Sequence, residues 1–168
     1  MATNTYIEFK EPNIKGESTD SNHKDHIEVM SWTHGFTQTT SATRASAGGG
    51  TVEMANHQDF NFTKYTDSAT DDLLQYCWSG KHIKSAIFHA YRADGDNKPC
   101  KYLEINMESV IVSNISIGGG PSDLPVENVS LSYGKVTYKY IPQDEAKGTA
   151  GGVEPVSHDL IKRQVSSK

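Results

Sequence analysis

The chain has 168 residues, 35% of them hydrophobic and 22% charged, and a formal net charge of −5 at pH 7. This composition is typical of a soluble globular protein, and it predicts one domain over residues 1–168. The acidic balance argues against nucleic-acid binding, and no segment approaches the roughly 18 apolar residues that membrane insertion needs.

The N-terminal segment lacks a basic region followed by an apolar one, so we expect a protein that is made in the cytoplasm without a signal peptide. The two cysteines, Cys77 and Cys100, form neither a disulfide framework nor a zinc site, and we expect reduced thiols. Three Asn-x-Ser/Thr sequons begin at Asn61, Asn114 and Asn128. They imply glycosylation only in a eukaryotic secretory context, so we discount them.

The first elements are predicted to be a strand at residues 4–10, NTYIEFK, and a turn-rich loop at residues 11–25. Residues 28–36, EVMSWTHGF, then alternate as a strand does, with Met30 and Trp32 on one side. Because an aromatic of this size buries on the order of 150–250 Å², we expect the side with Trp32 to face the core.

The opposite side of this strand carries the short hydroxyl residues Ser31 and Thr33, which therefore point away from the core. Ile27 and Val29 share their odd phase. We therefore expect the strand to bulge or change its exposure near Met30.

Residues 37–50, TQTTSATRASAGGG, contain no apolar residue larger than alanine and predict an extended exposed loop. Residues 51–65 return to strand character. Their larger apolar side chains share one phase: Val52, Met54, Phe60 and Phe62.

A period change at residues 68–81, SATDDLLQYCWSGK, predicts the one helix, because its apolar residues repeat at i and i+4. Ser68 or Thr70 is expected to cap its start and Gly80 to end it.

Two long strands are predicted at residues 82–93 and 100–117, joined by a turn at Asp94-Gly95. In the second strand the expected core face comprises Leu103, Ile105, Met107, Ile111, Ile115 and Ile117. The expected solvent face comprises Tyr102, Glu104, Asn106, Glu108 and Asn114.

Residues 127–141 form a further strand whose apolar phase flips at Gly134, where we expect a bulge. Residues 144–168 lose their periodicity and are expected to be an irregular C-terminal tail. The whole pattern predicts a mainly β protein, an antiparallel β-barrel of two packed sheets with one flanking α-helix.

The sequence contains no catalytic constellation that we can identify. No G-x-S-x-G or phosphate-binding loop occurs, and Glu104 and Glu108 are interpreted as solvated residues rather than as a glycosidase pair. His23 and His26 lack the further ligands of a metal centre, so they are interpreted as solvated loop histidines. We therefore expect no enzyme activity, no metal and no cofactor.

A series of segments, spread in order over roughly residues 5–143, resembles the haemolysin-coregulated protein (Hcp) family. The segments are IKGES at 14–18, His23, IEVMSWTHG at 27–35, FTKYTDSAT at 62–70, SGKHIKSA at 79–86, YLEI at 102–105, VIVSNISIGG at 110–119 and ENVSLSYGKVTYKYIPQ at 127–143. At Ser157–Leu160 the chain departs from the Gly-Trp-Asp-like ending of the family.

The resemblance implies a homo-hexameric ring that stacks into the inner tube of a bacterial type VI secretion system, without catalysis. It implies that the tube contacts spike and sheath components and is expelled with effectors that it carries. The protein would reside in the bacterial cytoplasm before assembly and would then be secreted without a signal peptide.

Two sites follow if the chain forms such a tube. The side of Ser31 and Thr33 is expected to line the channel and to contact effectors. The exposed loop is expected to contact the next ring through Thr40, Ser41, Thr43, Arg44 and Ser46.

The alternative from another functional class is a monomeric β-barrel that binds a small ligand or a glycan. Under this hypothesis Tyr138 and Tyr140 would stack on sugars. The oligomeric state distinguishes the two hypotheses.

Overall fold

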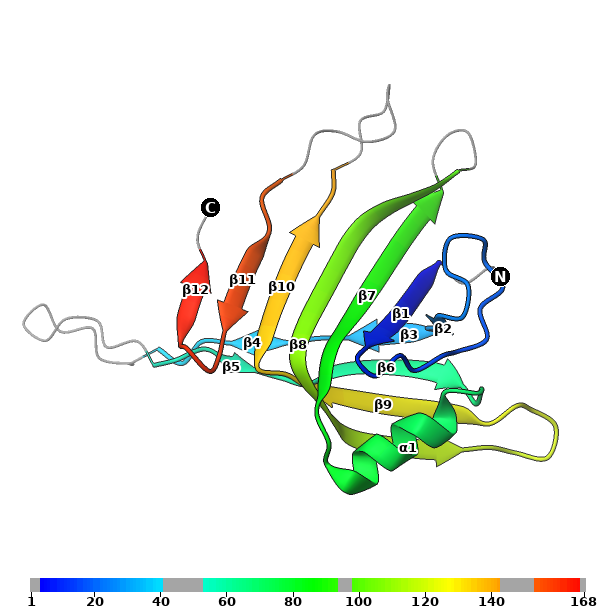
Figure 1. Cartoon of the computed structure of the whole chain (residues 1–168). Helices are drawn as coiled ribbons and strands as arrows, with labels where there is room; N and C mark the ends of the chain where they lie inside the picture. The colour runs from blue at the N-terminus through cyan, green and yellow to red at the C-terminus, as the bar shows by residue number, and fades with distance from the viewer. Residues whose placement is uncertain (1–3, 41–52, 94–97, 143–152, 167–168) are drawn as a thin grey trace, which may run out of the picture.

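A computed structural model describes residues 4–40, 53–93, 98–142 and 153–166 (Figure 1). Within these ranges the chain forms twelve strands and one helix, and all strand pairs are antiparallel. The expected mainly β architecture of antiparallel sheets with a single helix is confirmed.

The strands form two sheets that share one long strand, β8 (Figure 1). The upper sheet has the order β12-β11-β10-β8-β7-β1-β2. Its strands are β1 (Thr5–Lys10), β2 (Ile27–Glu28), β7 (Ile83–Ala93), β8 (Pro99–Gly118), β10 (Lys135–Tyr140), β11 (Val156–Asp159) and β12 (Gln164–Ser166).

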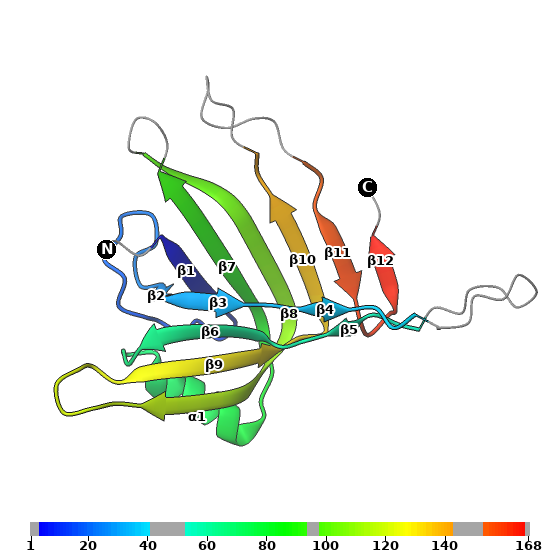
Figure 2. The same cartoon turned by 180° about the vertical axis from the view of Figure 1, so that it is seen from behind.

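The lower sheet has the order β3-β6-β9-β8 and uses the second half of β8. Its other strands are β3 (Ser31–Thr33), β6 (Phe60–Tyr65) and β9 (Val126–Ser132). A two-stranded ribbon of β4 (Phe36–Thr37) and β5 (Asn56–His57) extends from the ends of β3 and β6 (Figure 2).

The chain passes between the sheets on both sides, so the two sheets enclose one core. On one side β8 crosses directly, and on the other the chain crosses between β2 and β3. There the Val29 N–H donates to the Thr5 carbonyl at 3.0 Å and the Met30 N–H donates to the Thr63 carbonyl at 2.8 Å. The enclosed space is filled by apolar side chains, among them Phe88 and Leu131.

The expected change of exposure near Met30 is confirmed at this second crossing. Ile27 and Val29 are fully buried, whereas Met30 is 46% exposed. Beyond Met30 the phase is reversed, because Trp32 packs on Phe88 with ring centroids 4.9 Å apart.

The expected core face of β8 is only partly correct. Ile105 and Met107 are buried as predicted, but beyond them Val110 and Val112 are buried and Ile117 is 49% exposed. Two irregularities change the phase. Ser109 has a left-handed backbone with φ of +54°, and the register with β9 shifts just after Val112.

At Gly134 the apolar phase does flip as predicted, but the structural cause is a sheet crossing rather than a bulge in one strand. The chain leaves β9 in the lower sheet at Ser132 and enters β10 in the upper sheet at Lys135. A Cβ on Gly134 would lie 2.7 Å from the end of the exposed Ile161 side chain, which would have to move to make room for it.

The prediction of an irregular tail over residues 144–168 is wrong for part of that range. β11 and β12 form a hairpin that adds to β10, with Val136 opposite His158. The hairpin lies in a segment without apolar alternation, and strand pairing to β10 supplies its backbone hydrogen bonds. The expected turn at Asp94-Gly95 lies outside the described residues, as does residue range 143–152.

The helix α1 (Thr70–Ser79) follows β6 and ends at Gly80, whose φ of +64° is left-handed, as predicted for a helix end. The predicted capping residues are wrong. Ala69 occupies the cap position without a side-chain hydrogen bond, and the Asp67 carboxylate accepts from the Ala69 N–H at 3.0 Å instead.

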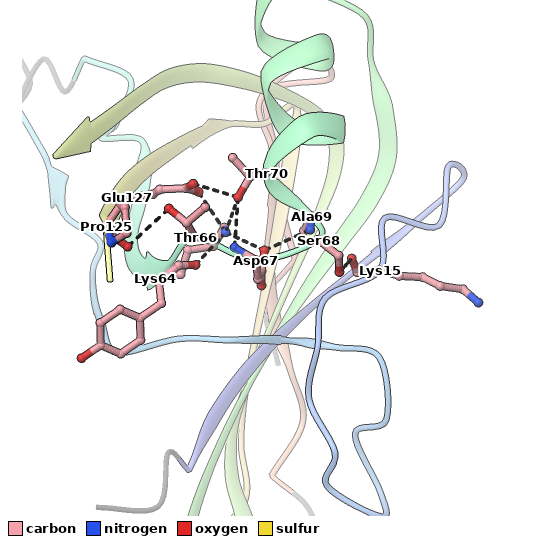
Figure 3. Close-up of polar contacts among 10 residues, drawn as sticks. Lys15, Lys64, Thr66, Asp67, Ser68, Ala69, Thr70, Pro125 and Glu127 are labelled. Carbon is pink, nitrogen blue, oxygen red and sulfur yellow. Dashed lines mark hydrogen bonds and ion pairs between the residues drawn. The ribbon is translucent and has the colours of Figure 1, made fainter. Parts of the chain in front are cut away.

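The first turn of α1 is joined to the sheet by a buried charged network that the sequence did not reveal (Figure 3). Lys64 on β6 and Glu127 on β9 are directly opposed and fully buried, with Nζ and Oε2 2.9 Å apart. Lys64 Nζ also lies 2.7 Å from the Asp67 carboxylate, and the Thr70 hydroxyl donates to Glu127 at 2.8 Å. The network therefore fixes α1 to two strands of the lower sheet.

Replacing Lys64 with methionine is expected to destabilise the fold by about 3–5 kcal/mol, because it leaves Glu127 buried without its cation. Urea unfolding at fixed protein concentration measures this loss. The control is Lys84→Met, which removes the exposed ion pair with Glu11 and should cost no more than about 1 kcal/mol. Equal losses in the two variants would show that burial of the Lys64 network is unimportant.

Candidate functional site

The outer side of the lower sheet carries two rows of small uncharged polar side chains. Directly opposed residues of antiparallel strands point to the same side of a sheet, so the strand registers define the rows. One row is Ser31, Thr63, Asn128 and Ser116, and the other is Thr33, Asn61, Ser130 and Asn114. We call these eight residues the polar face.

The polar face exists because the strands alternate and one side of the sheet is buried. The residues between the polar ones, such as Phe62 and Val129, are fully or almost fully buried in the core. Each second position is thereby left on the outside, where its side chain is exposed or half-exposed.

Hydrogen bonds between neighbouring strands hold several of these side chains in place. The Thr63 hydroxyl donates to the Asn128 amide oxygen at 2.8 Å, and the Ser130 hydroxyl donates to the Asn61 amide oxygen. The Asn61 amide nitrogen donates to the Asp59 carbonyl at 3.0 Å. The result is a fixed surface of hydroxyl and amide groups without a formal charge on any of its eight residues.

Both residues that the sequence assigned to the channel, Ser31 and Thr33, lie exposed on this face. The other six residues were missed, although a signal was present. Asn61, Asn114 and Asn128 are the three sequon asparagines, and each has its Ser or Thr two positions later. In a strand this spacing places both side chains on one side of the sheet.

The loop residues expected to contact the next ring are mostly outside the described part of the chain. Thr40 is described and exposed, close to the β4–β5 ribbon. Ser41, Thr43, Arg44 and Ser46 lie outside the described residues. Thr37 is not part of a loop, because it pairs with Asn56 in the ribbon.

A second polar feature is a chain of hydrogen bonds that joins the sheet crossings, the ribbon and the C-terminal hairpin. His34 contacts the hydroxyls of both Tyr138 and Tyr133, with Nε2 2.7 Å from the latter. His57 lies 2.8 Å from the Tyr133 hydroxyl and 2.7 Å from His158 Nδ1. A neutral imidazole has one donor and one acceptor nitrogen, so all four contacts are satisfied when the three rings are neutral.

Burial favours the neutral state of His34 and His57. It lowers the pKa of His34 to about 4, and the neighbouring His57 acts in the same direction. Burial also lowers the pKa of His57, together with the charge of His158.

Tyr138 takes part in this chain of hydrogen bonds, and its position there affects the glycan-binding hypothesis. Its ring is stacked on His34 with centroids 5.7 Å apart, and its hydroxyl is used by His34. Tyr140 remains 50% exposed. The pair proposed to stack on a sugar is thus reduced to one accessible ring.

The interpretation of His23 and His26 as solvated loop residues is wrong for His23. Its ring is 6% exposed and stacks on Tyr6 with centroids 4.6 Å apart. His23 Nδ1 lies 3.0 Å from His26 Nδ1, and burial lowers the pKa of His23 to about 4. The loop packs on the outer side of the upper sheet here.

Glu104 and Glu108 lie on the outer side of the upper sheet in ion pairs. Glu104 is 2.7 Å from Lys101 Nζ and Glu108 is 3.6 Å from Lys135 Nζ. Among the described residues, no group of three or more His, Cys, Asp or Glu side chains is arranged to hold a metal ion. No helix in the described part of the chain is long and apolar enough to cross a membrane.

Comparisons with known proteins agree on one family. Residues 6–140 match the family model described as "Type VI secretion system effector, Hcp". Protein hcp1 of Pseudomonas aeruginosa is 38% identical over 165 residues, which cover 98% of each chain.

Solved structures show the same fold. A structure described as that of a type six secretion system protein has a TM-score of 0.86 at 27% identity, covering 98% of this chain and all of the other. Hcp1 from Salmonella typhimurium has a TM-score of 0.76 at 29% identity, covering 99% of this chain and all of the other.

We expect the free energy of unfolding to decrease as the pH is lowered from about 6.5 to 4, because the buried His34 binds a proton less readily in the folded than in the unfolded chain. The contribution is fully present above pH 6.5. Urea unfolding at pH 7 and at pH 5 measures the loss, and His34→Gln should make the difference smaller. The exposed His82→Gln is the control and should leave the difference unchanged. An undiminished difference in His34→Gln would contradict the assignment.

Proposed function

The chain belongs to the Hcp family of type VI secretion proteins, and we propose that it assembles into hexameric rings whose channel is lined by the polar face. It is a structural component of the type VI secretion system. The observation that carries the proposal is that all eight residues of the polar face have uncharged hydroxyl or amide side chains.

Such a surface suits a channel through which folded proteins pass. Short side chains keep a bore wide, and hydroxyl and amide groups keep it hydrated while offering weak hydrogen bonds. Charged groups, by contrast, would bind or repel each cargo according to its charge. We propose that effectors contact this surface and are expelled together with the tube.

The edges of the lower sheet support a ring of copies. Among the described strands, β3 pairs only with β6, and the second half of β8 pairs only with β9. Both outer edges therefore present backbone groups to a neighbour. Contact between these two different edges is head-to-tail and gives a closed ring when the rotation closes.

The remaining parts of the proposal follow from family membership. We propose that rings stack into a tube that meets the spike and sheath, and that no catalytic step is involved. The protein is proposed to be made in the bacterial cytoplasm and to leave the cell without a signal peptide. The monomeric glycan-binding alternative is disfavoured by the filled core and by the engagement of Tyr138 with His34.

Thr33→Gln tests the channel assignment, because it places a longer side chain on every copy around the bore. The substitution is exposed, so the free energy of unfolding should change by no more than about 0.5 kcal/mol and rings should persist. Secretion of the cell's effectors, measured in culture supernatants, should fall.

The control is Thr137→Gln, the same substitution on the upper sheet, where the side chain faces away from the lower sheet's polar face. It should leave secretion unchanged. Normal export of every effector by Thr33→Gln would refute the channel assignment, and a misfolded variant would contradict the exposed position of Thr33.

Shortening the segment 41–50 is expected to abolish tubes while leaving rings, if this segment contacts the next ring. The segment contains no apolar residue larger than alanine, so the core does not depend on it. Electron microscopy and sedimentation distinguish tubes from rings. Loss of the rings, or tubes of normal length, would contradict this role.

A further inference from the structure

The structure contains an apolar groove with no partner among the described residues. It is a hollow of about 300 Å³ between the ribbon and the C-terminal end of the upper sheet. Phe36 from β4, Val156 from β11 and Val165 from β12 line it and are 47%, 44% and 61% exposed. Val136 and Tyr138 form its floor.

A matching apolar side chain lies elsewhere on the same chain. Trp78, in the last turn of α1, is 79% exposed and is the most exposed large hydrophobic residue in the described part of the chain. Tryptophan is the residue most enriched among those that dominate protein interfaces, because it buries a large area with few rotatable bonds. Trp78 contributes little to the core of its own copy, so its exposure is unexplained by the fold.

The two surfaces lie on opposite edges of the lower sheet. The helix packs against β8, which is one edge strand, whereas the ribbon that borders the groove continues from β3, the other edge strand (Figure 2). A head-to-tail contact between the β8 edge of one copy and the β3 edge of the next brings the α1 side of the first copy toward the ribbon side of the second.

We propose that Trp78 of one copy inserts into the groove between the ribbon and the C-terminal hairpin of the next copy. The inference rests on the proposed ring and specifies its contact. A second copy is the occupant because the chain carries both halves of the contact on different edges, which is the arrangement that a head-to-tail ring requires.

The helix α1 and the C-terminal hairpin carry opposite formal charges. The helix contains Asp71 and Asp72 and no basic residue, which gives it a formal charge of −2. The hairpin of residues 156–166 contains Asp159, Lys162 and Arg163, so its formal charge with neutral His158 is +2 − 1 = +1. The acidic first turn of α1 and the basic hairpin turn therefore attract each other, whereas Lys81 follows the end of the helix that carries Trp78.

Two substitutions, one on each surface, test the proposal. Trp78→Ala removes the inserted side chain and Val165→Glu places a charge in the groove. Each should raise the protein concentration at which rings dissociate by roughly tenfold or more, measured by light scattering and native mass spectrometry. Leu124→Ala, which removes another exposed apolar side chain away from both surfaces, should leave it unchanged.

Mixing the two variants provides the decisive measurement. A mixture of Trp78→Ala and Val165→Glu contains one intact contact, the tryptophan of the second variant with the groove of the first. At a concentration where neither variant assembles alone, the mixture should therefore form heterodimers but no rings. Because both sites are exposed, unfolding midpoints should match the wild type, which separates lost assembly from misfolding.

The outcomes separate this inference from the proposed function. If the wild type forms rings and the rings of both variants dissociate at the same concentration as those of the wild type, the Trp78 contact is wrong and the ring proposal still holds. A wild-type protein that stays monomeric at every concentration would overturn both. Failure of the mixture to form heterodimers, with both variants folded, would also overturn the contact.

Discussion

The structure depends on side-chain alternation in a sheet that is buried on one side only. In the lower sheet alternate residues of β3, β6, β9 and the middle of β8 enter or border the core, so the residues between them face outward. The strand registers then align these outward residues into two continuous rows. Because these outward residues all carry hydroxyl or amide groups, the surface is uniform. This surface is the feature that the proposed channel requires.

Alternation also explains how much of the fold the sequence could predict. It located β1, β6, β7, β8, β9 and β10, and the phase changes after Val29 and at Gly134 marked two of the places where the chain passes between sheets. The crossing within β8 was missed although Val110 and Val112 carry the changed phase, because Ile111, Ile115 and Ile117 continue the earlier apolar phase in the sequence. The C-terminal hairpin was missed for a related reason, since pairing with β10 rather than apolar periodicity maintains it.

Features that depend on contacts between distant residues were beyond sequence reasoning. Lys64 and Glu127 are ordinary charged residues in the sequence, and only the register between β6 and β9 places them together in the interior. The chain of hydrogen bonds through His34 and His57 likewise joins residues far apart in sequence. The polar face could be predicted in part. Ser31 and Thr33 were identified, and the three sequons carried the rest of the signal as strand alternation.

Family membership and the polar face lead to one central claim, that the outer side of the lower sheet lines the channel of a ring. A reconstruction of the purified protein by electron cryomicroscopy tests it most directly. The account predicts hexameric rings in which the rows that begin at Ser31 and Thr33 face the central channel. Monomers, or rings in which these rows lie on the outer surface, would contradict it.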